Sequence, residues 1–307
     1  MEIWRMKRFF ALSRSTHGVL DIAAPGFCAL LWLGDFPHWQ IILLSLFTAF
    51  AAYTAIYTLN DLVGIAVDRE KFVGGINAGY SVEASEMRYP LAQNVLSYRD
   101  GLLWFAGWFS LALIGSYLLN PAIIIILIAA AILEIIYCLL FKVTYLRTLV
   151  SGLVKSCGPI AAVFVVDPSP SPYLLLVLFI WLFFWEIGGQ NVPADWNDTV
   201  EDQRVYAKTI PLRFGFEKAG LIVMTALALT VIASGFLPLI SPANLGSLYV
   251  LASWLIGYFL LLRPGFQLYK LKAGGQAARL FDKASYYPLS QLILISIFLV
   301  ANKILGA

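Results

Sequence analysis

Long apolar runs alternate along this chain with shorter polar segments. Each run is long enough, as a helix, to cross about 30 Å of hydrocarbon. We predict nine membrane-spanning helices, at residues 18–34, 38–59, 101–119, 121–141, 149–166, 172–194, 216–237, 246–262 and 287–305. The pattern therefore predicts an all-α integral membrane bundle in which residues 1–307 form a single multi-pass domain.

The composition excludes a soluble protein. Hydrophobic residues make up 60% of the chain and charged residues only 13%, whereas charged residues make up about 25% of a soluble domain. The net charge of +3 is small, and its placement on one side of the membrane gives no indication of nucleic-acid binding.

The positive charges predict the orientation in the membrane. All Lys and Arg residues except Lys303 occur in the N-terminal arm, in the segment after every second span, or at adjoining helix ends. Because such residues favour the cytoplasmic side, we predict that the N-terminus and the loops 60–100, 142–148, 195–215 and 263–286 are cytoplasmic. An odd number of spans then places the C-terminus outside a cell (inner) membrane.

Acidic residues follow the second span. Asn60, Asp61 and Asp68 lie where this apolar run ends. Asp61 and Asp68 are seven positions apart, so they share one helix face if the second helix continues beyond the membrane surface.

A second acidic group follows the sixth span. Asn191, Asp195, Asp198 and Asp202 have the spacing i, i+4, i+7 and i+11, which predicts one stripe along a single helix. Like charges at these spacings repel one another, so we expect a cation opposite them.

Two facing groups of carboxylates favour a two-metal diphosphate site over a merely solvated pair of helix ends. Ionised groups at headgroup depth are costly and often functional. Mg²⁺ prefers oxygen ligands and shares its coordination between carboxylates, water and phosphate. The candidate metal ligands are Asn60, Asp61, Asp68, Asn191, Asp195, Asp198 and Asp202, of which Asp61, Asp68, Asp198 and Asp202 are also the candidate catalytic residues.

Four basic residues are candidates for binding the diphosphate. Arg69, Arg88 and Lys208 lie close to the acidic groups in sequence, although each is equally explained as a signal for membrane orientation. Lys155 lies inside the fifth span, where it must be paired, reach the interface or face a polar cavity.

The two acidic groups resemble the motifs of the UbiA superfamily of intramembrane prenyltransferases. The family pattern N-D-x-x-D-x-x-x-D stands here as Asn60-Asp61-x-x-Gly64-x-x-x-Asp68. The second pattern, D-x-x-x-D followed by a basic residue, Thr and Pro, stands as Asp198-x-x-x-Asp202 and Lys208-Thr209-Ile210-Pro211. Gly64 departs from the pattern, because the resemblance implies a carboxylate there.

This resemblance implies Mg²⁺-dependent transfer of a prenyl chain from a polyprenyl diphosphate to an aromatic or other lipophilic acceptor, with release of diphosphate. A UbiA-type terpene cyclase is an alternative within the same fold, and an ion-coupled secondary transporter is an alternative of another class. Glu134 and Glu186 lie within predicted spans and are candidates for binding the acceptor or acting as a base. For His17 and Asp21 the alternatives are acceptor binding, an interhelical hydrogen bond or a frayed helix end, and the last two are favoured.

Overall fold

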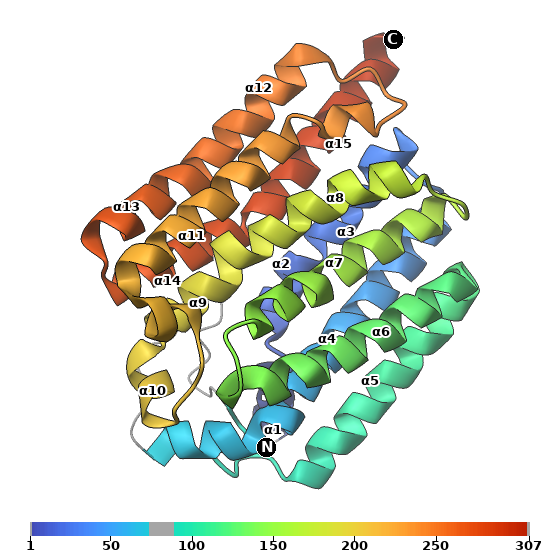
Figure 1. The fold of residues 1–307 in the computed structure, drawn as a ribbon. Helices are drawn as coiled ribbons and strands as arrows, with labels where there is room; N and C mark the ends of the chain where they lie inside the picture. Colours follow the sequence, from blue (N-terminus) through green and yellow to red (C-terminus); the bar gives the residue numbers. More distant parts are fainter. Residues whose placement is uncertain (1, 74–88, 306–307) are drawn as a thin grey trace.

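The structure is a computed structural model that describes residues 2–73 and 89–305. Across those two ranges it is a bundle of long helices that run side by side (Figure 1), with nine segments long and apolar enough to cross a membrane. They are Ser15–Leu33, Trp39–Lys71, Tyr98–Leu119, Pro121–Lys142, Arg147–Val166, Pro172–Asn197, Ile210–Leu239, Gly246–Leu271 and Gly274–Leu305. Each overlaps one predicted span, which confirms the all-α membrane bundle.

Several spans are divided into shorter helical elements. The first half of the chain contains α1 (Glu2–Leu12), α2 (Ser15–Asp21), α3 (Ala23–Leu33), α4 (Trp39–Val73), α5 (Tyr98–Leu119), α6 (Pro121–Leu139), η1 (Leu140–Lys142) and α7 (Arg147–Val166). The second half contains α8 (Pro172–Trp185), η2 (Glu186–Asn191), α9 (Val192–Asn197), α10 (Thr199–Arg204), α11 (Ile210–Ser234), η3 (Leu237–Leu239), α12 (Gly246–Gly257), η4 (Tyr258–Leu262), α13 (Arg263–Leu271), α14 (Gly274–Ser285) and α15 (Tyr287–Leu305).

The hairpin between α5 and α6 shows how the sequence fixes a tight connection. Asn120 ends α5 in an extended conformation and caps α6, since its side chain accepts a hydrogen bond from the backbone N–H of Ala122 at 2.9 Å. Pro121 begins α6, where its missing N–H has no cost. The two helices therefore reverse direction within one residue and pack side by side.

Two π-helical turns precede prolines. The turn η2 ends two residues before Pro193, and η4 ends two residues before Pro264. A proline lacks the N–H of a regular helical turn, and its ring clashes with the carbonyl four residues earlier. The wider turn accommodates this clash, and at η2 it turns a polar segment toward the interior of the bundle, where all six of its residues are buried.

The predicted cytoplasmic segments are more helical than loops. α4 extends for 35 residues, or about 52 Å at 1.5 Å per residue, so Asp61 and Asp68 do lie on one continuous helix. The range 263–286 forms α13 and α14, which lengthen the last two spans. The predicted single helix through the second acidic group is wrong at Asp198, which separates α9 from α10. Asn197 donates a side-chain hydrogen bond to the Asp198 carboxylate at 3.0 Å, a local interaction that competes with regular helix.

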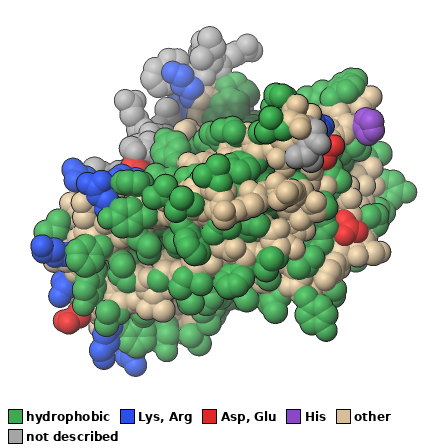
Figure 2. Space-filling view, turned by 90° about the horizontal axis from the view of Figure 1, so that it is seen from above, with side chains coloured by type: hydrophobic (Ala, Val, Ile, Leu, Met, Phe, Trp, Pro, Cys, Tyr) green, Lys and Arg blue, Asp and Glu red, His purple; other side chains and the backbone are tan. Residues whose placement is uncertain are grey.

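The outer surface is predominantly apolar. Figure 2 shows hydrophobic side chains across one face of the bundle, with Lys and Arg gathered toward one end of that face. The interior is filled by large side chains such as Phe27, Trp181 and Trp185, all of them buried. A protein with this surface lies within a bilayer, with most of its Lys and Arg side chains at one end.

Candidate functional site

A cavity of about 520 Å³ lies between α2, α3, α4, α6, α7 and η2. Its polar end is lined by Arg14, Asn60, Tyr137 and Asn191, next to the acidic groups. Most of its remaining wall is apolar and reaches toward the opposite end of the helices, where it is lined by residues such as Pro37, Leu119 and Val166. The cavity can therefore hold a molecule with a polar head and a long hydrocarbon tail.

The second acidic group lies beside the polar end of the cavity and faces two buried cations. Lys71 Nζ lies 2.6 Å from Asp202 Oδ1, and Arg147 Nη2 donates to Asp195 Oδ1. Asp202 is only 1% exposed. Burial raises the pKa of the Asp202 carboxyl, and the neighbouring Lys71 ammonium opposes that rise. Lys71 and Arg147 thus make it possible for these carboxylates to be buried.

Aromatic rings hold both cations in place. The Arg147 guanidinium lies 4.6 Å from the ring centroids of Tyr137 and of Phe141. Lys71 Nζ lies 4.5 Å from the Phe141 ring. Cation–π contacts of this kind are stronger where water is excluded, so they fix the cations against the carboxylates.

The first acidic group is held from the N-terminal side of the bundle. Arg14 Nη2 lies 3.1 Å from Asp61 Oδ1 and 3.3 Å from Asn60 Oδ1. The Asn60 amide donates in turn to Glu134 Oε1 at 2.5 Å. Arg14 adopts a left-handed conformation with φ 45° just before α2, and strain of this kind is common at functional sites.

Gly64 and Asp68 mark the departure from the family motif. A Cβ added at Gly64 would lie 3.2 Å from Asp68 Oδ2. A carboxylate at position 64 would therefore lie beside Asp68, but the glycine that occupies this position supplies no ligand. Asp68 itself is partly buried on the part of α4 that extends beyond the apolar run.

The nominated diphosphate-binding residues lie in different places. Arg69 and Lys208 are exposed, with Arg69 donating to Asn94 Oδ1 at 3.3 Å. Lys155 lies deeper in the membrane and pairs with Asp21 Oδ2 at 2.6 Å. Arg88 falls outside the described residues.

The sequence reasoning missed three cations that contact the carboxylates, namely Arg14, Lys71 and Arg147. Lys71 could have been found, because it lies three positions after Asp68 on the same helix and so beside it. Arg147 begins the fifth span, but only the tertiary arrangement brings it to Asp195. Cations do face the second acidic group, as expected, but they are Lys71 and Arg147 and not the basic residues nominated from the sequence.

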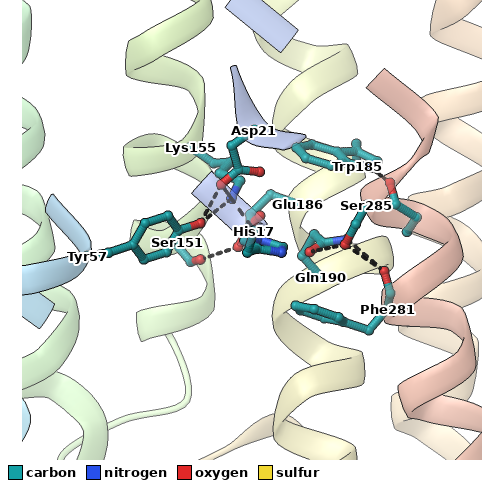
Figure 3. A network of polar contacts seen from close by, with 11 residues as sticks. His17, Asp21, Tyr57, Ser151, Lys155, Trp185, Glu186, Gln190, Phe281 and Ser285 are labelled. Carbon is teal, nitrogen blue, oxygen red and sulfur yellow. Dashed lines mark hydrogen bonds and ion pairs between the residues drawn. The ribbon is translucent and has the colours of Figure 1, made fainter. Parts of the chain in front are cut away.

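A network of polar side chains continues into the membrane-embedded part of the cavity (Figure 3). Asp21 accepts hydrogen bonds from Tyr57 and Lys155, and His17 Nε2 lies 3.6 Å from the same carboxylate. One turn from Lys155 on α7, Ser151 donates to Glu186 Oε1 at 2.6 Å. These groups come from α2, α4, α7 and η2, so the network joins four elements around one wall.

The acidic residues suit a divalent cation that is shared with a ligand. Within the described ranges no three His, Cys, Asp or Glu side chains form a ready metal cluster. Asp195 Oδ2 and Asn191 Oδ1 are buried oxygens without a hydrogen-bond partner among those same residues. Mg²⁺ takes part of its oxygen shell from phosphate and water, so these oxygens fit it without a closed protein cage.

The fold and the site together define an α-helical membrane protein built around a cavity with an acidic rim. The sequence profile described as the UbiA prenyltransferase family matches residues 22–289. The chain belongs to this family, and it is a multi-pass membrane prenyltransferase. A comparison with curated proteins finds no match.

Solved structures share the fold at low sequence identity. A UbiA homologue from Aeropyrum pernix K1 has a TM-score of 0.71 and 15% identity, with 94% of this chain and 98% of that chain covered. A UbiA homologue from Archaeoglobus fulgidus bound to DMAPP and Mg²⁺ has a TM-score of 0.68 and 15% identity, covering 94% and 99%. A structure described as digeranylgeranylglyceryl phosphate synthase has a TM-score of 0.68 and 17% identity, covering 98% and 100%.

Proposed function

We propose that this prenyltransferase uses Mg²⁺ to transfer a prenyl chain from a polyprenyl diphosphate to a lipophilic acceptor. The observation that carries the proposal is the cavity, whose polar end adjoins the acidic groups and whose apolar part extends through the bundle. A diphosphate would lie at the acidic rim while its hydrocarbon chain fills the apolar part. Two structures of one related protein support the donor class, since a UbiA homologue from Archaeoglobus fulgidus was solved with DMAPP and with GPP, in each case with Mg²⁺.

The oxygen ligands of the metal would come from both acidic groups. They are Asn60, Asp61, Asp68, Asn191, Asp195, Asp198 and Asp202, as the sequence predicts. Mg²⁺ bound there supplies positive charge that stabilises the diphosphate as a leaving group. Our candidates for direct contact with phosphate oxygens are Arg69, Arg88, Lys155 and Lys208, of which Lys155 lines the cavity.

The residues around these groups orient them and exclude water. Arg14, Lys71 and Arg147 fix the directions of Asp61, Asp202 and Asp195 by ion pairing. Ionisation of an allylic diphosphate leaves a carbocation, which a dry and π-rich wall protects from water. Tyr57 and Tyr137 line the cavity close to the polar end and are suited to this role.

We also propose the orientation that the charges predict. The N-terminus and the acidic rim would face the cytoplasm of a cell (inner) membrane, and the C-terminus would lie outside. The Lys208→Cys substitution places a single cysteine at this exposed position in a variant without native cysteines. This cysteine should react with a membrane-impermeant thiol reagent only after the cells are permeabilised. Labelling of intact cells would contradict this orientation.

The test of the function is a reaction in liposomes. Purified protein, labelled geranylgeranyl diphosphate, Mg²⁺ and a lipid extract as the source of lipophilic acceptors should release diphosphate and form a labelled prenylated product. The Asp198→Asn variant should lose this activity. Failure of the wild-type protein to break down polyprenyl diphosphates of any length would overturn the proposal. A cyclic hydrocarbon formed without an acceptor would instead indicate a terpene cyclase.

A further inference from the structure

The membrane-embedded wall of the cavity carries a distinctive balance of charge. Three basic side chains line the cavity within the described part of the chain, and each lies against an aspartate. Arg14 pairs with Asp61 at 3.1 Å, while Lys155 at 2.6 Å and His17 at 3.6 Å share Asp21. The positive charge of this wall is therefore already matched by carboxylates.

Two more carboxyl groups line the same cavity without a cationic partner of their own. Glu134 accepts a hydrogen bond from the Asn60 amide at 2.5 Å, and Glu186 accepts one from the Ser151 hydroxyl at 2.6 Å. Neither forms an ion pair with a residue of the described ranges. The wall consequently holds more carboxyl groups than cations. Away from the rim, where Mg²⁺ would balance the donor diphosphate, this excess disfavours an acceptor that carries its own carboxylate or phosphate.

One carboxylate oxygen on this wall, Glu186 Oε2, is buried and has no hydrogen-bond partner within the described chain. Glu186 is only 6% exposed and lies in the π-helical turn η2. A buried oxygen that lacks a hydrogen bond is costly, so Glu186 Oε2 fits a ligand that donates a hydrogen bond.

We propose that the acceptor is an uncharged molecule bearing a hydroxyl group, and that Glu186 accepts the proton of this hydroxyl during transfer. The inference rests on the proposed prenyltransferase function and adds the class of acceptor to it. The Ser151 hydroxyl holds Glu186 Oε1, so Oε2 is the oxygen that remains available to the acceptor.

The transfer step balances with the diphosphate as the leaving group. The bond between prenyl C1 and the bridging diphosphate oxygen breaks, and the electron pair leaves with the diphosphate. The acceptor hydroxyl oxygen forms the new bond to C1, and its proton passes to the Glu186 carboxylate. Release of that proton to water regenerates Glu186, so the products are a prenyl ether, diphosphate and one proton.

The experiment compares acceptors that differ mainly in charge. The first pair is 4-hydroxybenzyl alcohol and 4-hydroxybenzoate, and the second is a monoacylglycerol and its phosphate ester. The full-length protein in liposomes receives each probe with geranylgeranyl diphosphate and Mg²⁺, and ether products are measured by mass spectrometry. We expect each uncharged probe to be prenylated on oxygen at least tenfold faster than its charged counterpart.

The Glu186→Gln variant tests the base. Loss of a general base typically lowers the rate by about 10²–10⁴-fold, so transfer to the uncharged probes should fall by at least about 100-fold. Stabilisation by the donor diphosphate, read by thermal shift, should remain. Thr230→Val is the matched control, because Thr230 is buried outside the cavity and bonds only to the Ala226 carbonyl of its own helix.

The outcomes separate the two proposals. If the donor binds, three results would each overturn the inference about the acceptor. They are faster transfer to the charged probes, transfer to none of the probes, and full activity of Glu186→Gln. Absence of any Mg²⁺-dependent donor binding by the wild-type protein would instead overturn the proposed function.

Discussion

Replacement of Arg147 by Met should strongly destabilise the protein. Arg147 is 4% exposed and Asp195 is 5% exposed, and the two form an ion pair. Met fills a similar volume but leaves the Asp195 carboxylate buried without its partner. Removal of one member of a buried pair costs about 3–5 kcal/mol. With a shift of about 2 °C per kcal/mol for a chain of this size, the melting temperature should fall by about 6–10 °C.

The assay is thermal unfolding of the purified protein in one detergent, followed by intrinsic tryptophan fluorescence. The double variant Arg147→Met, Asp195→Asn removes both charges and should recover most of the loss, since the unpaired charge causes it. Lys142→Met is the matched control. Lys142 pairs with Glu70 at 2.7 Å, but these side chains are 37% and 54% exposed, and such a pair contributes about 0–1 kcal/mol.

Two results would refute this reasoning. The first is a melting temperature for Arg147→Met that falls no further than that of Lys142→Met, because the Arg147 pair would then not be buried. The second is a double variant as unstable as the single one, which would place the loss in the contacts of Arg147 with Tyr137 and Phe141.

Three other predictions concern the metal and its ligands. Gly64→Asp should place a carboxylate beside Asp68 and lower the Mg²⁺ concentration needed for half-maximal turnover. Gly64→Ala should leave this concentration unchanged, and equal effects of the two variants would assign the change to packing. Asp198→Asn should abolish turnover. Its melting temperature should stay within about 2 °C of wild type, because the change is close to isosteric. Retained turnover would exclude Asp198 as a metal ligand. Addition of EDTA should remove the stabilisation by diphosphate ligands. The melting temperature of the ligand-free protein should not change, because Lys71 and Arg147 already balance the charges of Asp202 and Asp195. Unfolding by EDTA would indicate a structural metal.

The spans could be predicted because hydropathy is a local property of the chain. Residues 121–141, for example, are so apolar that no other environment suits them, and the structure places a span at Pro121–Lys142. Hydropathy does not predict the end of α4. The apolar run ends near residue 59, whereas the helix continues with polar residues to Val73.

The site could be predicted only in part. The acidic motifs are contiguous in sequence, so the candidate metal ligands could be named from the sequence. Their partners depend on how distant helices pack, which is why Arg147 and Lys71 were missed as the cations beside Asp195 and Asp202. An aspartate beyond a span would ordinarily be taken as exposed, yet Asp202 is 1% exposed because Lys71 reaches it from another helix.

The central claim is that a polyprenyl diphosphate binds in the cavity with Mg²⁺ at its acidic rim. The most direct measurement is thermal stabilisation of the detergent-purified protein by diphosphates of several chain lengths, each compared with the corresponding alcohol. We predict stabilisation by the diphosphates that requires Mg²⁺, that increases with chain length until the apolar part of the cavity is filled, and that is absent for the alcohols. A ligand present at 100 times its dissociation constant stabilises by about 2.7 kcal/mol, which is readily measured. Equal stabilisation by diphosphate and alcohol, or stabilisation independent of Mg²⁺, would contradict the claim.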